Sequence, residues 1–291
     1  MSISPAAHPL VVALLALGGA PAQDSPRPAE PQSPSAQESI DLPALIAKVR
    51  AAHWPTPRKA PLDRFKALLR NTPARSDQAS AEIDLTVSFL APSLLRYRVD
   101  EPGKTLEQGV DEKGVWSLIG KEVQRIQGKE QRSEAETARG YVSLAAELLK
   151  LLDPAAVLES LQEPSAPRPS SFAPNGKDRV PTYVVSGRLD DFPLQAPTPD
   201  GKRSATVALT ITVDARTGLL VLAEARPLND KHEPTGALER VLLRDPIEQG
   251  GMVLPRELLL YRGNQLDSRV AIRSIDLSPE GLTADSIRRP R

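Results

Sequence analysis

The chain has 291 residues, and its 37 Lys and Arg residues balance its 37 Asp and Glu residues, so the formal net charge is zero. This balance argues against nucleic-acid binding, which uses a clustered basic excess. The lack of cysteine excludes disulfides, thiolate metal sites, a cysteine nucleophile and a lipid-modified N-terminal cysteine. With two Trp, four Tyr and four Phe, the apolar side chains are mostly aliphatic, which suits acyl chains better than bases or sugars.

The first 38 residues have the composition of an export signal and a linker. Residues 10–20 are apolar and uncharged, and Ala20-Pro21-Ala22 has the small-x-small form that signal peptidase recognises. We therefore expect residues 1–22 to be a signal peptide cleaved near Ala22, and the protein to be periplasmic. Residues 1–9 contain neither Lys nor Arg, so an uncleaved segment or a misassigned start codon is the alternative. Residues 23–38, rich in Pro and Ser, predict a disordered tether, and residues 39–291 one domain.

The first half of this domain reads as a helix followed by an antiparallel meander. Apolar residues recur at helical spacing from Ile40 to Val49, with Pro43 near the start and Trp54-Pro55 at the end, which predicts a helix of about three turns. Apolar and polar residues then alternate in short runs separated by Pro and Gly turns. The predicted strands are residues 61–70 (with Phe65 inward), 83–89, 95–99, 105–110, 114–119 and 121–126.

The second half reads as helices followed by more strands. A long helical pattern begins at Ser133, with Val142, Leu149 and Leu152 on one side, and a shorter helix follows Pro154. The Pro- and Ser-rich residues 162–178 predict a loop. Strands are predicted over residues 180–189, 204–213, 219–226, 238–249, 252–261 and 265–277.

Motifs for catalysis or cofactor binding are absent from the sequence. It contains no Gly-rich phosphate loop, no G-x-S-x-G and no H-E-x-x-H. Asp230, His232 and Glu233 could be considered a metal cluster, but adjacent polar residues in a loop are more often solvated turn residues. We therefore predict neither an enzyme nor a metal or cofactor site.

The order of these elements resembles the LolA/LolB-like family of periplasmic lipoprotein carriers. Members have a strand, a Pro bend, an aromatic-rich strand, a Pro turn, and a strand leading to Asp-Gly and Trp. The matching residues are Phe89-Leu90-Ala91-Pro92-Ser93-Leu94-Leu95-Arg96-Tyr97-Arg98-Val99-Asp100-Glu101-Pro102, then Val110-Asp111-Glu112-Lys113-Gly114-Val115-Trp116, Asp214-Ala215-Arg216-Thr217-Gly218-Leu219 and Gly251-Met252-Val253-Leu254-Pro255. The chain differs from lipoprotein carriers at Ala91, where they have Arg before the bend proline.

The resemblance implies an unclosed antiparallel β-barrel, a half-barrel of about 10–12 strands lidded by about three helices. It also implies an exported carrier or binding protein for a lipid acyl chain or lipoprotein in the cell envelope. The alternative is an envelope-stress sensing or protein-interaction module with the same fold. We expect a monomer whose partners are a hydrophobic ligand or lipidated protein, with an envelope protein and peripheral membrane machinery as further partners.

The inward positions of the alternating strands and of the long helix are the candidate ligand-binding residues. The same pattern also fits a dry core packed directly by the helices, because alternation does not distinguish a filled core from a ligand space. The candidates are Leu85, Val87, Phe89, Leu95, Tyr97, Val99, Trp116, Leu118, Val142, Leu149, Leu209 and Ile211.

Overall fold

The computed structural model describes residues 39–57, 62–74, 82–91, 94–101, 104–111, 114–119, 122–125, 152–174, 176–190, 206–229, 231–234, 238–288 and 290. All of them belong to one compact unit, Pro34–Arg291. The predicted signal peptide, the tether and the helix from Ser133 to residue 151 lie outside the described residues, so those predictions stand as predictions.

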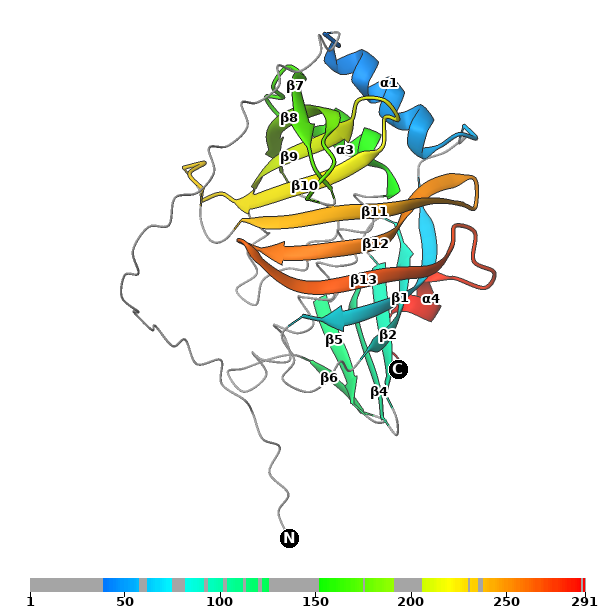
Figure 1. Ribbon diagram of the computed structural model, residues 1–291. Helices are drawn as coiled ribbons and strands as arrows, with labels where there is room; N and C mark the ends of the chain where they lie inside the picture. Colours follow the sequence, from blue (N-terminus) through cyan, green and yellow to red (C-terminus); the bar gives the residue numbers. More distant parts are fainter. Residues whose placement is uncertain are drawn as a thin grey trace, which may run out of the picture. The chain divides into compact units, whose positions relative to one another are not determined.

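The described strands form a single antiparallel sheet (Figure 1). Its order is β6-β5-β4-β3-β2-β1-β13-β12-β11-β10-β9-β8-β7, so β6 and β7 are its two edges and the barrel is not closed. The predicted half-barrel is therefore confirmed. Its strands are β1 (Arg64–Pro73), β2 (Ile83–Leu90), β3 (Leu94–Glu101), β4 (Lys104–Asp111), β5 (Gly114–Ile119), β6 (Glu122–Arg125), β7 (Arg168–Phe172), β8 (Val180–Leu189), β9 (Val207–Asp214), β10 (Leu220–Pro227), β11 (Glu239–Gln249), β12 (Met252–Arg262) and β13 (Gln265–Asp276).

The sheet has thirteen strands because one strand lies in the segment predicted as a loop. This strand, β7, pairs with β8 from Arg168–Val184 to Phe172–Val180. Its residues, Arg-Pro-Ser-Ser-Phe, are almost all exposed and lack the apolar alternation of a half-buried strand. Without that signal, the segment resembles a polar connection.

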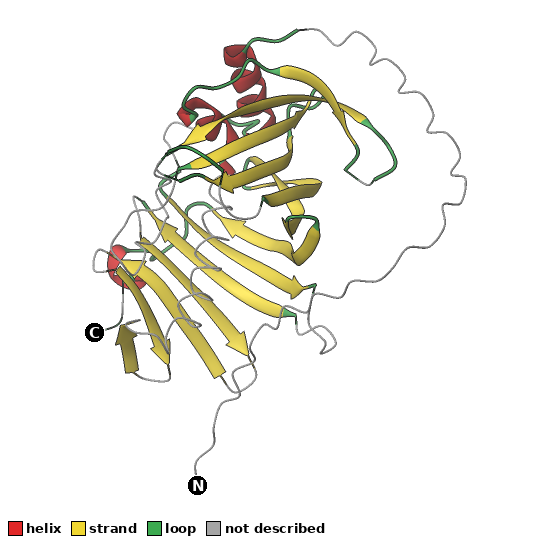
Figure 2. Ribbon diagram, turned by 90° about the vertical axis from the view of Figure 1, so that its left-hand side faces the viewer, coloured by secondary structure: helices red, strands yellow, loops and turns green. Residues whose placement is uncertain are grey.

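The two halves of the chain meet where β1 pairs with β13. Leu69 on β1 is the partner of Ile272 on β13 and, on its other side, of Leu85 on β2. This pairing of the first strand with the last joins the meander β1–β6 to the meander β7–β13. Figure 2 shows the strands of both halves from a second direction.

Strand β2 illustrates why the sheet has one apolar face. Its buried residues alternate with less buried ones, and Leu85, Val87 and Phe89 are each at most 3% exposed. Phe89 lies opposite Phe65 of β1, with ring centroids 5.6 Å apart, and Phe65 faces inward as predicted. We call the face that carries these side chains the inner face of the sheet, and the opposite face the outer face.

Two helices pack together near the second half of the sheet. In α1 (Leu42–His53), Asp41 accepts a hydrogen bond from the Ala44 N–H at 2.8 Å, which caps the helix N-terminus. The helix buries Leu45, Val49 and His53, spaced four residues apart. It is tied to α3 (Pro154–Ser160) because the Trp54 indole Nε1 donates to the Leu152 carbonyl at 3.1 Å.

The third described helix, α4 (Ala284–Ile287), is only one turn long and was not predicted from the sequence. Its capping box pairs Thr283 with Ser286, and the fully buried Ile287 anchors it. The Ser286 carbonyl accepts a hydrogen bond from Arg96 of β3 at 2.7 Å. The C-terminal segment is therefore fixed to the outer face of the first half of the sheet.

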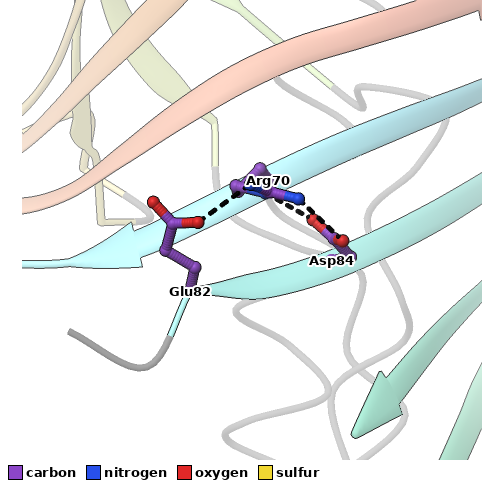
Figure 3. A network of polar contacts seen from close by, with 3 residues as sticks. All are labelled: Arg70, Glu82 and Asp84. Carbon is purple, nitrogen blue, oxygen red and sulfur yellow. Dashed lines mark hydrogen bonds and ion pairs between the residues drawn. The ribbon is translucent and has the colours of Figure 1, made fainter.

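Ion pairs on the outer face also link neighbouring strands (Figure 3). Arg70 on β1 is the register partner of Asp84 on β2 and binds its carboxylate with two nitrogens, at 2.7 and 3.1 Å. A third nitrogen of Arg70 donates to Glu82 at 2.9 Å. These hydrogen bonds lower the pKa of Asp84 and raise that of Arg70.

Candidate functional site

The inner face brings together most of the predicted ligand-binding residues. Register partners in an antiparallel sheet project from the same face, so side chains of β2 and β3 meet there. Each of these six side chains is between 0% and 3% exposed. The pairs are Leu85 with Val99, Val87 with Tyr97, and Phe89 with Leu95.

A second part of the inner face comes from β9, more than a hundred residues further along the chain. Ile211 is the register partner of Val185 on β8 and Ala223 on β10, and Leu209 lies two positions before it. Leu209 and Ile211 are 3% and 2% exposed and belong to the same apolar cluster as Val87. The two halves of the sheet thus contribute to one continuous apolar surface, which includes residues of α1 and α3.

Trp116 and Leu118 lie on the outer face, which corrects the expectation that they share a surface with Val87. Gly109 on β4 is the partner of both Arg96 and Trp116, so Trp116 projects with Arg96 and away from Tyr97. Leu118 is likewise aligned with Glu107 and is only partly buried. Whether either residue binds a ligand remains a prediction.

Gly109 makes room for the Trp116 ring on the outer face. A Cβ at this position would lie 2.6 Å from the ring and 2.6 Å from the Leu95 carbonyl oxygen. The Arg96 guanidinium carbon lies 5.9 Å from the ring centroid, within cation–π range. The missing side chain thus explains how the Trp116 ring is fully buried on the outer face.

A polar pair interrupts the apolar inner face. Gln108 and Ser117 are register partners of one another, and Gln108 is also the partner of Tyr97. They are 2% and 1% exposed, and the Gln108 amide lies 3.3 Å from the Ser117 hydroxyl. The sequence prediction missed this pair, although the alternation from Leu106 indicates that Gln108 faces inward.

The two candidate ligand-binding residues of the predicted long helix, Val142 and Leu149, lie outside the described residues.

A cavity of about 360 Å³, which we call the seam cavity, lies beside α1, where β10, β11 and β12 begin or bend. Its volume is within the range of small-molecule sites. Its buried lining residues include Leu220, Leu243 and Leu254, at 5%, 6% and 1% exposure. The full lining is His53, Pro174, Asp214, Thr217, Leu219, Leu220, Val221, Leu243, Arg244, Asp245, Pro246, Val253, Leu254 and Pro255.

His53 lines the seam cavity from the C-terminal end of α1. The side chain is 2% exposed, and its Nε2 accepts a hydrogen bond from the Leu220 N–H at 3.0 Å. Burial lowers the pKa of His53 to about 4, against a smaller opposing effect of the Val253 backbone. The imidazole is therefore neutral at pH 7 and acts as a hydrogen-bond acceptor. The sequence prediction placed His53 only at a helix end.

A second cavity, of about 260 Å³, lies on the outer face between β1–β4 and the C-terminal segment. Its lining is polar, with Lys66, Arg96 and Arg98 opposed by Glu107 and Glu280. Arg96 forms an ion pair with Glu107, and Arg98 lies 3.7 Å from the same carboxylate. The cationic groups are thus partly neutralised.

Across the described ranges, no three His, Cys, Asp or Glu residues are grouped to hold a metal ion, and no helix is long and apolar enough to span a membrane.

Comparison with known proteins places this arrangement among LolA-like folds. A LolA superfamily protein, NE2245 from Nitrosomonas europaea, superposes with a TM-score of 0.51 at 12% sequence identity, over 86% of this chain and 99% of that one. A DUF1329 family protein from Desulfovibrio piger ATCC 29098 matches with a TM-score of 0.49 at 9% identity, over 84% and 96%. No protein-family model matches the sequence, and no curated protein is significantly similar. The chain therefore has a LolA-like fold, as its motifs predicted.

Proposed function

We propose that this protein is an exported carrier or binding protein that holds a hydrophobic ligand, an acyl chain or the lipid anchor of a protein, in the periplasm. The observation that carries the proposal is the continuous apolar inner face, shared by β2, β3 and β9 in a sheet that does not close. Burying an acyl chain gains about 0.8 kcal/mol per CH₂ group, so an aliphatic surface binds tightly without specific polar contacts.

The LolA-like fold supports this proposal because its sheet does not close into a barrel, so the inner face is not sealed by pairing of the two edge strands. The aliphatic character of the inner face supports it as well, since Leu, Val and Ile dominate the cluster. The proposal assigns binding to these residues and no catalytic step. It predicts that the ligand is recognised mainly by the length of its apolar chain.

The test is to identify what the protein binds when it is produced in a host with membranes. Native mass spectrometry and solvent extraction of the purified protein should detect acyl lipid at a stoichiometric level. After delipidation, the protein should take up a fluorescent monoacylglycerol. Protein that carries no lipid and does not take up the probe would contradict the proposal.

The exposed edge strand β7 favours a second candidate, a protein-interaction module. Four of its five residues are exposed, and the strand stands at one end of the sheet, where an extended partner segment can add a strand. Affinity capture from envelope extract, with and without detergent, separates the two candidates. Partners of a carrier should be lipidated and lost in detergent, whereas partners of an interaction module should be retained.

A further inference from the structure

Strands β10 and β11 separate at the end that borders the seam cavity. Their ladder runs only from the pair Leu222–Leu242 to the pair Ala225–Glu239. Beyond it, Asp245 has a φ of +50°, a left-handed conformation that is rare for a residue with a side chain, and Pro246 has no N–H to donate. This part of β11 therefore cannot continue a regular ladder with β10, and the two strands leave a gap in the sheet.

The gap is held open by contacts that fix its walls. Leu220, the first residue of β10, is bound by His53, and the Lys48 ammonium of α1 donates to the Ala215 carbonyl in the turn before β10. Gly218 in this turn has a φ of +79°, and a Cβ there would lie 3.0 Å from the Lys48 carbonyl oxygen. Helix and turn are thus in close contact, so the seam cavity is a preformed feature rather than a gap between mobile segments.

The chemistry of the seam cavity divides into an apolar floor and an acidic mouth. Leu220, Leu243 and Leu254 are buried, whereas Asp245 is exposed at the surface. In the described part of the chain, the charged groups that line the mouth are Asp214, Asp245 and Arg244. Arg216 lies 3.9 Å from Asp214, and Glu257 lies 3.9 Å from Arg244.

Among the described residues, the one cation that lines the seam cavity is itself engaged. Arg244 donates to the Pro174 carbonyl at 3.1 Å and faces the carboxylate of Glu257. Asp214 accepts from the backbone N–H groups of Arg216 and Thr217, at 2.7 and 3.1 Å, which keeps its carboxylate in place. The exposed carboxylate at the mouth is therefore that of Asp245, beside the largely buried Asp214, which has Arg216 3.9 Å away, and His53 adds no positive charge at pH 7.

We propose that the seam cavity binds the apolar tail of an amphiphile whose head group carries no negative charge, such as an acyl ester, an acyl amide or an alkyl ammonium. The tail lies on Leu220, Leu243 and Leu254, and the head lies at Asp214 and Asp245. This inference rests on the proposed function for the ligand's hydrophobic class. Leu220, Leu243 and Leu254 belong to the same apolar cluster as Val87, and the inference adds a location at the edge of that cluster and a head-group preference.

The first test compares three amphiphiles with the same twelve-carbon tail, below their micelle-forming concentrations. Monolaurin and dodecyltrimethylammonium should each bind the full chain roughly tenfold more tightly than laurate at low ionic strength, because the carboxylates at the mouth, mainly the exposed Asp245, repel the carboxylate of laurate. The difference from laurate should shrink in about 0.5 M salt, as screening predicts. Equal or tighter binding of laurate would overturn the head-group preference.

The second test uses variants that fill the cavity or alter its mouth. Val221→Trp places a large ring in the seam cavity and should abolish binding of monolaurin in this cavity, seen as the loss of the preference for monolaurin over laurate, whereas Leu222→Trp, the adjacent residue outside the lining, should leave that preference intact. Asp245→Asn should reduce the preference for dodecyltrimethylammonium several-fold, since Asn tolerates the left-handed conformation and removes only the charge. Circular dichroism and the unfolding midpoint confirm that each variant is folded.

The outcomes separate this inference from the proposed function. If Val221→Trp binds monolaurin as wild type does, the seam cavity is not the site, and binding at the inner face survives. If Asp214 and Asp245 are both replaced by Asn and the head-group preference persists, the acidic mouth does not set it. If wild-type protein binds none of the three amphiphiles, both the inference and the proposed function fail.

Discussion

His53 accepts a hydrogen bond from the backbone N–H of Leu220, and so joins the last residue of α1 to the first residue of β10. The two residues are 167 positions apart in the sequence. The imidazole is a buried acceptor that satisfies a backbone donor where β10 has already left β11. Its burial lowers the pKa of His53 to about 4, so the ring is neutral at pH 7.

The first prediction concerns the pH dependence of stability. The folded-state pKa of His53, about 4, lies below the ordinary value of 6.5, so only the unfolded chain binds a proton between these values. The contribution of neutral His53 to the free energy of unfolding is therefore fully present above about pH 6.5. It falls by roughly 3 kcal/mol as the pH drops to about 4. Urea unfolding of wild type at about pH 7.5 and at about pH 4.5 should show this loss.

The matched variant for this prediction is His53→Gln. A Gln side-chain oxygen can accept from Leu220 but does not titrate, so the variant should lose roughly 3 kcal/mol less than wild type over the same pH interval. Because each protein is compared with itself at the two pH values, any effect of the substitution on the free energy of unfolding that does not depend on pH cancels. An identical pH dependence in both proteins would show that His53 does not control it.

The second prediction concerns Gly109. Adding a methyl group there forces it to within 2.6 Å of both the Leu95 carbonyl oxygen and the Trp116 ring, and neither can move freely in the sheet. Gly109→Ala should destabilise the protein by about 3 kcal/mol. Gly263→Ala, where the turn is open but φ is +61°, should cost only about 1 kcal/mol. Equal costs in thermal unfolding would contradict the placement of Trp116 on the outer face.

The third prediction concerns the Arg70–Asp84 pair. Because both side chains are substantially exposed, Asp84→Asn should lower the free energy of unfolding by less than about 1 kcal/mol at neutral pH. The pKa of Asp84 is lowered, so its contribution is present above about pH 4 and disappears as the pH falls below it. Glu82→Gln, which removes the charge of a carboxylate that accepts only one hydrogen bond from Arg70, is the control with the smaller effect. A larger loss in high salt than in low salt would exclude an ion-pair origin.

The fourth prediction concerns the inner and outer faces of the sheet. Val87→Glu and Leu209→Glu place a charge on the apolar inner face and should abolish uptake of a fluorescent monoacylglycerol. Ser88→Glu places the same charge on the outer face, opposite Lys66, and should leave uptake unchanged. Folded Val87→Glu protein that binds like wild type would show that this side chain does not contact the ligand.

The local elements of this fold could be predicted from the sequence wherever one face of a strand is buried. Leu85, Val87 and Phe89 alternate with polar residues, so both the strand and its inward side chains were predicted correctly. Strand β7 has no such alternation, because as an edge strand it buries almost nothing. The pairing of β1 with β13 depends on contacts between the two ends of the domain, which no local pattern encodes.

The face of Trp116 could not be predicted because it depends on the register with β4. The sequence Val-Trp-Ser-Leu-Ile has apolar residues at both sets of alternate positions, and only Gly109, seven residues earlier, provides space on the outer face. One feature of the sequence indicates the irregular strand beside the seam cavity: the dipeptide Asp245-Pro246 inside a predicted strand. Such a dipeptide favours a turn, and a proline within a strand is typical of a bulge or an edge.

The most direct test of the account is photolabelling of the wild-type protein with a monoacylglycerol that carries a diazirine on its acyl chain. Mass spectrometry of the digested protein identifies the labelled positions. The account predicts labels at inner-face residues of β2, β3 and β9, such as Val87, Tyr97 and Ile211, with competition by unlabelled monolaurin. Labels confined to outer-face residues such as Ser88 and Arg98, or labelling that monolaurin does not reduce, would contradict it.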